Sequence, residues 1–217
     1  QGNHGEDVKE YYYYLDSTPT HSYAKMLYKY PQVAYPYADL VHENERRGKD
    51  DPEYELVDAI GDALDAGRYF DVFVEYAKAG EEDILCRITA HNRGPDAAPL
   101  HLLPQIWFRN TWSWTHEAPR PQMEATGDRE VRLRQEDLGE RWWYADAPDG
   151  AAVDLLFTHN ETNRERIHDA ANPSPHVKDG INDHVVDGAP DAVHPEQRGT
   201  KAAAHVQFEI PAGAPRT

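Results

Sequence analysis

Two aromatic-rich segments carry the residue types that proteins use to bind sugars. Residues 2–23 mix carboxylates and hydroxyls with four consecutive tyrosines at positions 11–14, and residues 107–114 hold three tryptophans. Trp112 and Trp114 share a face if their segment is extended. Aromatic rings stack on the C–H faces of sugars, while acids and amides hydrogen-bond the hydroxyls. The segments therefore indicate either a saccharide contact or a packing role, with tyrosines alternating along a strand and tryptophans forming a core corner or docking patch.

The candidate contacts to a sugar cleft or to a neighbouring domain come from both segments. They combine rings with groups that donate or accept hydrogen bonds, and they are Glu6, Asp7, Lys9, Tyr12, Asp16, His21, Arg109, Trp112 and Trp114. Glu6 and Asp7 form an acidic pair, and acid–base work at a glycosidic bond needs two carboxyl groups about 5–10 Å apart on opposite sides of it. Neighbours in sequence rarely face each other in this way. We therefore predict that the pair is solvated or salt-bridged, and no catalytic residue is predicted.

Several other chemistries are excluded by spacing. No two glycines lie two residues apart and no Gly-Lys-Ser/Thr sequence occurs, which argues against dinucleotide and phosphate-loop sites. No serine lies in a Gly-x-Ser-x-Gly turn, so a serine hydrolase is not indicated. The twelve histidines include no His-Glu-x-x-His, and Cys86 is the only cysteine. We expect neither a metal site nor a cofactor, and we expect Cys86 to point inward as a small hydrophobic residue.

The charge balance narrows the choice of partners. Lys and Arg number 22 against 39 Asp and Glu, a net charge of −17, which disfavours binding to nucleic acid or to an anionic membrane. A single cysteine forms no intrachain disulfide, and no apolar run approaches the ~20 residues that span a bilayer. These features favour a cytoplasmic protein.

The elements that must position the aromatic segments are strands. Apolar and polar residues alternate with a period of two over several short segments separated by Pro-rich or Gly-rich turns. The predicted strands cover residues 68–76, 83–91, 98–109, 130–135, 141–145, 152–158 and 201–210. Residues 83–109 read as a hairpin, because Asn92 to Asp96 have turn chemistry. This pattern predicts a mainly β protein built as an antiparallel β-sandwich.

Two segments lack this alternation. Residues 1–66 are predicted to form an aromatic-rich excursion of loops with a short helix over residues 37–47, where acids precede Arg46 and Arg47. Residues 168–199 are rich in proline and acids and are predicted to form a long loop. The main strands then occupy residues 67–217, and we expect one sandwich domain over residues 1–217, cut from a longer protein.

Five segments carry a resemblance to a known family. The chain is similar to the N-terminal region of large bacterial glucosidases related to mannosyl-oligosaccharide glucosidase, glycoside hydrolase family 63. The similar segments are residues 2–23, residues 68–79, His-Asn-Arg-Gly-Pro at 91–95, Trp-Phe-Arg-Asn-Thr-Trp-Ser-Trp at 107–114, and Gly-Thr-Lys-Ala-Ala-Ala-His at 199–205. Together they extend over nearly the whole chain.

The resemblance implies a supersandwich-like N-terminal β-sandwich that packs on a C-terminal (α/α) barrel. In the family that barrel holds the general acid and base of an inverting hydrolysis, and it lies outside this sequence. No catalytic carboxylate is therefore carried over, and the chain alone is expected to be inactive. The implied partners are the barrel of the same polypeptide and an oligosaccharide or small glycoside. Two alternatives remain open: a stand-alone carbohydrate-binding module, and a purely structural or oligomerisation module.

Overall fold

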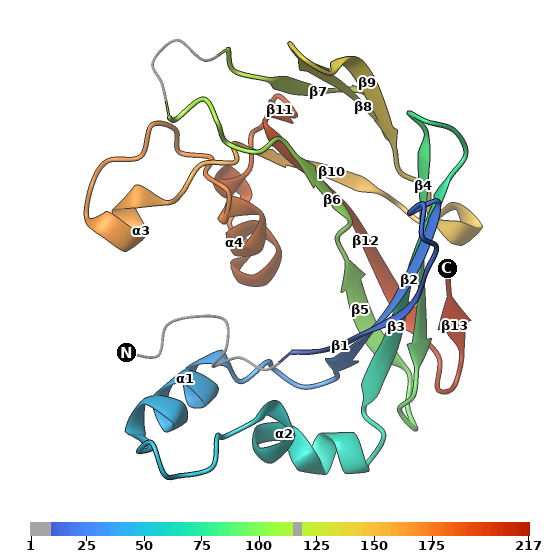
Figure 1. Ribbon diagram of the computed structural model, residues 1–217, viewed down its shortest axis with the longest axis vertical. Helices are drawn as coiled ribbons and strands as arrows, with labels where there is room; N and C mark the ends of the chain where they lie inside the picture. The colour runs from blue at the N-terminus through green and yellow to red at the C-terminus, as the bar shows by residue number, and fades with distance from the viewer. Residues whose placement is uncertain (1–9, 115–118) are drawn as a thin grey trace. The chain divides into compact units, whose positions relative to one another are not determined.

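The computed structural model describes residues 10–114 and 119–217, and the chain is mainly β (Figure 1). Antiparallel sheets and a few short helices confirm the predicted β-sandwich-like class. The residues divide into two compact units. The first comprises the chain as far as Leu100 together with Glu209–Thr217, and the second comprises His101–Phe208.

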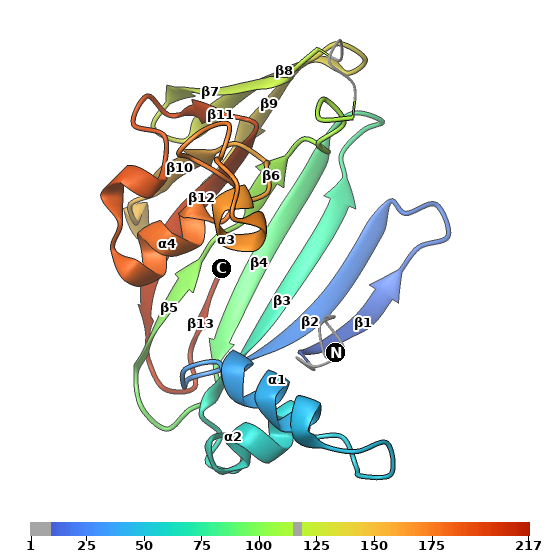
Figure 2. The ribbon, with the colours of Figure 1, turned by 90° about the vertical axis from the view of Figure 1, so that its left-hand side faces the viewer.

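The first unit is built on a five-stranded antiparallel sheet with the order β1-β2-β3-β4-β13 (Figure 2). Its strands are β1 (Tyr11–Ser17), β2 (Tyr23–Pro31), β3 (Tyr69–Lys78), β4 (Ile84–Asn92) and β13 (Pro215–Arg216). Two helices, α1 (Tyr37–Arg46) and α2 (Leu56–Asp65), join β2 to β3. They bury Leu40, Leu56 and Ile60 in a small apolar cluster of their own.

Residues 10–66 differ from the excursion of loops with a short helix that was predicted for this part of the chain. The helix predicted over residues 37–47 is confirmed by α1, but β1 and β2 pair with each other, and β2 pairs along its whole length with β3. The tyrosine run therefore forms an edge strand with alternating rings. The two faces of this strand differ little in hydrophobicity, because tyrosine occupies both of them.

The two faces of this sheet differ in chemistry. Residues paired across strands share a face, and one face carries Tyr12, Tyr14, Met26, Val74, Tyr76, Ile84, Cys86 and Ile88. The opposite face carries an ion-pair network in which Glu75 binds Lys25 and Arg87. Only the end of the first face near Phe70 and Val72 is buried. Cys86 is exposed, contrary to the expectation that it points inward, because its end of the face has no covering element among the described residues.

The second unit contains two sheets that pack face to face. One sheet has the order β10-β12-β5, with β6 also paired to β12, and the other has the order β11-β7-β8-β9. The strands are β6 (Gln105–Trp107), β7 (Gln122–Gly127), β8 (Glu130–Gln135), β9 (Gly139–Tyr144), β10 (Asp154–Thr158) and β11 (Arg198–Gly199), while β5 (Ala98–Leu102) and β12 (Lys201–Ile210) cross the unit boundary. The predicted strands over residues 130–135, 141–145, 152–158 and 201–210 are all present, within one to two residues at most ends.

The sandwich core lies between these sheets. Met123, Val131 and Leu133 from one sheet form a single buried cluster with Leu155, Phe157, Ala202 and Ala204 from the other. Trp143 packs against this cluster, whereas Trp142 is 44% exposed, so neighbouring tryptophans point to opposite faces as expected of adjacent positions in a strand. The other face of the β10–β12 sheet is covered by α4 (Gly180–Asp187), through Ile181.

Two further expectations are corrected. The predicted loop over residues 168–199 contains α4, the short helix η3 (Pro190–Ala192) and β11; the other short helices of this unit are α3 (Arg164–His168) and η2 (Pro148–Gly150). The predicted hairpin over residues 83–109 does not form, because β4 and β5 belong to different sheets. Within the described residues, none of the helices is long and apolar enough to cross a bilayer.

Candidate functional site

The register of β12 brings two loops of the second unit together. Lys201 is paired with Trp107 of β6 on one side and with Thr158 of β10 on the other. Because β6 and β10 both run antiparallel to β12, both strands end at the same edge of the sheet. The loop that follows β6 and the loop that follows β10 therefore leave the sheet side by side.

Thr200 joins these two loops through three hydrogen bonds. Its backbone N–H donates to the carbonyl of Thr158 (3.0 Å), and its carbonyl accepts from the N–H of Phe108 (3.1 Å). Its Oγ1 accepts from the N–H of Asn160 (2.8 Å). Thr200 is 1% exposed, so these bonds are shielded from water.

Two asparagines complete the connection. Asn110 Nδ2 donates to the carbonyl of Asn160 (3.0 Å), and Asn160 Nδ2 donates to the carbonyl of Phe108 (2.8 Å). Asn110 Oδ1 also accepts from the N–H of Ser113 (3.1 Å), which closes a turn. The loop that carries Trp112 and Trp114 is thus held by side-chain bonds as well as by the sheet.

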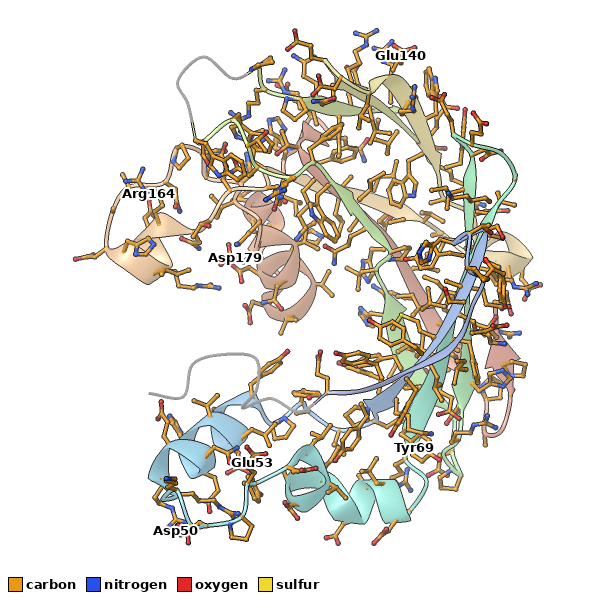
Figure 3. The ribbon with its side chains drawn as sticks, in the orientation of Figure 1. Asp50, Glu53, Tyr69, Glu140, Arg164 and Asp179 are labelled. Atoms are coloured by element: carbon orange, nitrogen blue, oxygen red, sulfur yellow. The ribbon has the colours of Figure 1, made fainter. Side chains whose placement is uncertain are left out.

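A pocket of about 540 Å³ lies between the loops. Its lining combines two indole rings with amide, hydroxyl, carboxylate and guanidinium groups, and comprises Asn110, Trp112, Ser113, Trp114, Glu161, Thr162, Arg164 and Pro173. Arg164, the first residue of α3, is labelled in Figure 3. The volume lies in the usual range for small-ligand sites, about 300–1,000 Å³.

Glu161 is the buried charged group of this pocket, with 9% of its surface exposed. Its Oε1 accepts hydrogen bonds from Trp112 Nε1 (3.1 Å) and from the Arg120 guanidinium (2.7 Å). Its Oε2 is buried and has no donor among the residues that the structure describes. Trp112 is fixed by this carboxylate, and the Arg120 guanidinium lies 6.0 Å from its ring centroid.

Trp114 is the exposed ring of the pocket, with 65% of its surface accessible. The Arg109 guanidinium lies 5.1 Å from its ring centroid. The structure therefore brings together three of the residues that the sequence singled out: Arg109, Trp112 and Trp114. The Trp112 ring is held by a hydrogen bond to a buried carboxylate, whereas most of the Trp114 side chain is exposed.

Three histidines adjoin this site. The His159 ring lies 6.1 Å from that of His194, which lies 4.8 Å from that of His176, and the backbone N–H of His159 donates to the His176 carbonyl (2.8 Å). Burial, and then the charge of Arg120, lowers the pKa of His159 from 6.5 to about 4. Burial and the neighbouring His176 also lower the pKa of His194. His159 is therefore neutral at neutral pH.

Acidification is expected to destabilise the protein through His159. Because the folded pKa is about 4 and the unfolded pKa about 6.5, the unfolded chain takes up the proton first as pH falls. The stabilisation is complete above the unfolded pKa and is lost as pH falls toward the folded value. Allowing for partial exposure, we expect a loss of about 1.5 kcal/mol between about pH 7.5 and pH 5. Urea unfolding at a series of pH values measures it.

The control for this pH dependence is His159→Gln. Glutamine does not titrate, so the variant should show a shallower fall in unfolding free energy over the same range. Carboxylates and histidines distant from position 159 titrate alike in both proteins and cancel in the comparison. Parallel pH profiles for the two proteins would contradict the assignment to His159.

The remaining candidates from the sequence are not part of this pocket. Tyr12, Asp16 and His21 belong to the first unit, and all three are exposed. The Tyr12 ring packs edge-on against Tyr14, with centroids 6.0 Å apart, and His21 occupies the β1–β2 turn with φ of 53°. Glu6, Asp7 and Lys9 lie outside the described residues. Within the described part of the chain, no group of three or more His, Cys, Asp or Glu side chains could hold a metal ion.

Sequence reasoning missed Glu161, Arg120 and Asn160. Glu161 lies 49 residues from Trp112 and 41 from Arg120 along the chain, so no local motif unites them. The detectable signal was the position of Asn160 and Glu161 just after the predicted strand over residues 152–158. Loops that follow neighbouring strands commonly carry binding residues.

Asn160 offers a direct test of how the pocket is held. Asn160→Ala removes the donor to the Phe108 carbonyl, and we expect the unfolding free energy to fall by about 1–2 kcal/mol. Trp112 should become more exposed, which shifts tryptophan emission to longer wavelength. Urea unfolding followed by fluorescence measures both effects. The matched control is Asn182→Ala, an exposed residue whose amide donates to the adjacent Asp183 (3.3 Å), and it should change neither quantity.

Comparison with known proteins identifies a relative in yeast. The uncharacterized protein YMR196W from Saccharomyces cerevisiae is 40% identical over 244 aligned residues, which include 98% of this chain. The chain spans 22% of the length of that protein. No family model matches the chain, and no solved structure matches it.

Proposed function

We propose that this chain is a non-catalytic β-sandwich domain of a glycoside hydrolase, which helps to shape a sugar cleft and packs on an (α/α) barrel of the same polypeptide. The observation that supports the proposal is the pocket where Trp112, Trp114 and the Glu161 carboxylate meet. The ligand would be an oligosaccharide or small glycoside. The single cysteine needs no oxidising compartment, so we propose a cytoplasmic location.

The chemistry of the pocket supports a saccharide more than other ligands. An exposed indole provides a flat surface for the C–H face of a sugar ring, and Glu161, Thr162 and Asn110 provide groups that hydrogen-bond hydroxyls. The rings are presented by loops on a rigid sandwich, which limits the conformational entropy lost on binding. The acidic surface of the protein argues against nucleic acid as the ligand.

The proposal is tested by titrating the chain with maltotriose and with mannobiose while tryptophan fluorescence is recorded. We expect a saturable change and no hydrolysis of either sugar. Trp114→Ala should weaken binding about tenfold or more, because it removes a stacking ring that is mostly exposed and lies outside the buried core. Trp142→Ala is the matched control, since Trp142 is exposed outside the pocket. A flat titration with the unmodified chain would contradict a saccharide site.

A second role, docking to another domain, is favoured by the exposed apolar face of the first unit. Tyr14, Tyr76 and Ile84 on this face are 84%, 47% and 60% exposed. Monomeric surfaces rarely expose contiguous apolar patches of this kind without a partner. We propose that the (α/α) barrel of the longer polypeptide covers this face.

Ile84 and Leu85 provide a matched pair for testing this docking role. Both are 60% exposed, and they lie on opposite faces of β4. Ile84→Lys and Leu85→Lys should each change the stability of the isolated chain by less than about 0.5 kcal/mol. In the longer polypeptide, only Ile84→Lys should lower the melting temperature. Equal melting temperatures for the two variants there would exclude this face as the interface.

A further inference from the structure

We infer that Glu161 determines the specificity of the pocket: its Oε2 accepts a hydrogen bond from a hydroxyl of an uncharged sugar, and it excludes sugars that carry a carboxylate. The inference rests on the proposed saccharide site and names the class of sugar that the site takes. It is carried by the burial of Glu161 and by the unequal hydrogen bonding of its two oxygens.

The two oxygens of Glu161 differ in what they still need. Oε1 is satisfied by Trp112 and Arg120, at 3.1 and 2.7 Å. Oε2 is buried and receives no donor from the described residues. A buried acceptor without a donor is destabilising, and more so when it is charged. A ligand that donates to Oε2 removes that cost, whereas a ligand without a donor leaves it in place.

The charge of the site favours a neutral donor. Arg120 already compensates the carboxylate through Oε1, so a cationic ligand is not required. A ligand carboxylate beside Oε2 would place two negative charges together in the buried part of the pocket, with no donor between them. Arg164 is exposed and lies at the rim of the pocket, where it would attract an anion without relieving that repulsion.

The consequence is a defined order of affinities for closely matched ligands. Methyl α-D-glucopyranoside and methyl α-D-glucuronopyranoside differ only in a hydroxymethyl group against a carboxylate at C6. We expect the uncharged glycoside to bind at least about tenfold more tightly than the acid, because the acid brings a second negative charge to a pocket that already holds the buried Glu161 carboxylate.

Glu161→Gln tests the assignment directly. Glutamine can keep an oxygen toward Trp112 and Arg120, and its amide places N–H donors where Oε2 stood. We expect the uncharged glycoside to bind about tenfold more weakly and the glucuronoside about tenfold more tightly, measured by fluorescence titration. Glu81→Gln, which makes the same change of charge at an exposed position outside the pocket, should leave both affinities unchanged.

A second measurement needs no substitution. Monofluoro analogues of the glycoside, each lacking one hydroxyl donor, are titrated against the unmodified chain. At least one analogue should bind about tenfold more weakly than the parent. Equal affinities for all analogues, or an unchanged preference in Glu161→Gln, would overturn the role of Glu161 while saccharide binding stands. Failure of every sugar to bind would instead overturn the saccharide site itself.

Discussion

Replacing Gly199 with alanine is expected to lower the free energy of unfolding by about 3 kcal/mol. A Cβ at this position would lie 2.2 Å from the backbone oxygen of Thr158 and 2.9 Å from its carbonyl carbon. Both atoms belong to the main chain, so the contact cannot be relieved by rotating a side chain. The Thr158 carbonyl also accepts the hydrogen bond of the Thr200 N–H, and displacing it would break that bond.

The effect of Gly199→Ala is measured by urea unfolding, with Gly80→Ala as the control. A Cβ added at Gly80 would meet no atom within 4 Å, and the φ of Gly80 is not positive, so alanine should be accepted there with a change below about 0.5 kcal/mol. A loss in Gly199→Ala no larger than in Gly80→Ala would show that β10 and β11 can separate at little cost.

The same substitution should also weaken saccharide binding. Gly199 precedes Thr200, which ties Phe108 to Asn160 and so sets the spacing of the two loops. A shift of the Thr158 carbonyl moves the start of the loop that carries Glu161 relative to the loop that carries Trp112. We therefore expect reduced sugar affinity even under conditions where the variant is fully folded.

Much of the fold could be predicted from alternation in the sequence. The strand over residues 201–210 alternates small and apolar residues against His205, Gln207 and Glu209, and β12 has the same bounds. The tyrosine run at positions 11–14 showed no contrast between an apolar and a polar face, because a phenol ring is suited to buried and to solvent-exposed faces alike. The local pattern of the sequence also could not predict which strands share a sheet, because β5 pairs with β12, about a hundred residues away along the chain.

Only part of the candidate site could be predicted from the sequence. Trp112 and Trp114 were visible because two indoles in a short loop are rare and chemically specific. Glu161 was not, because an acidic residue after a strand is common and its significance depends on burial. Burial in turn depends on the pairing of both β6 and β10 with β12, which brings residues about 50 positions apart into contact. The register between strands so far apart in the sequence is set by the packing of the whole sheet, so it could not be predicted from the local sequence.

The largest loss of stability is expected from Phe157→Ala, at about 4 kcal/mol. Phe157 is fully buried between the two sheets of the second unit, in one cluster with Met123, Val131 and Leu133. Truncation removes the buried apolar surface of the ring and leaves a cavity that strands from both sheets cannot close. Urea unfolding measures the loss, and Ile167→Ala, at a side chain that is 59% exposed, should change stability by less than about 0.5 kcal/mol.

Phe157→Ala and Gly199→Ala together separate stability from the geometry of the pocket. The Phe157 ring lies in the sandwich core and is not among the residues that line the pocket. Its truncation should therefore leave sugar affinity unchanged in the folded fraction, although it costs more stability than the change at Gly199. If affinity falls in both variants in proportion to stability, the pocket loops have no independent rigidity, and Thr200 and Asn160 do not hold them as inferred from their hydrogen bonds.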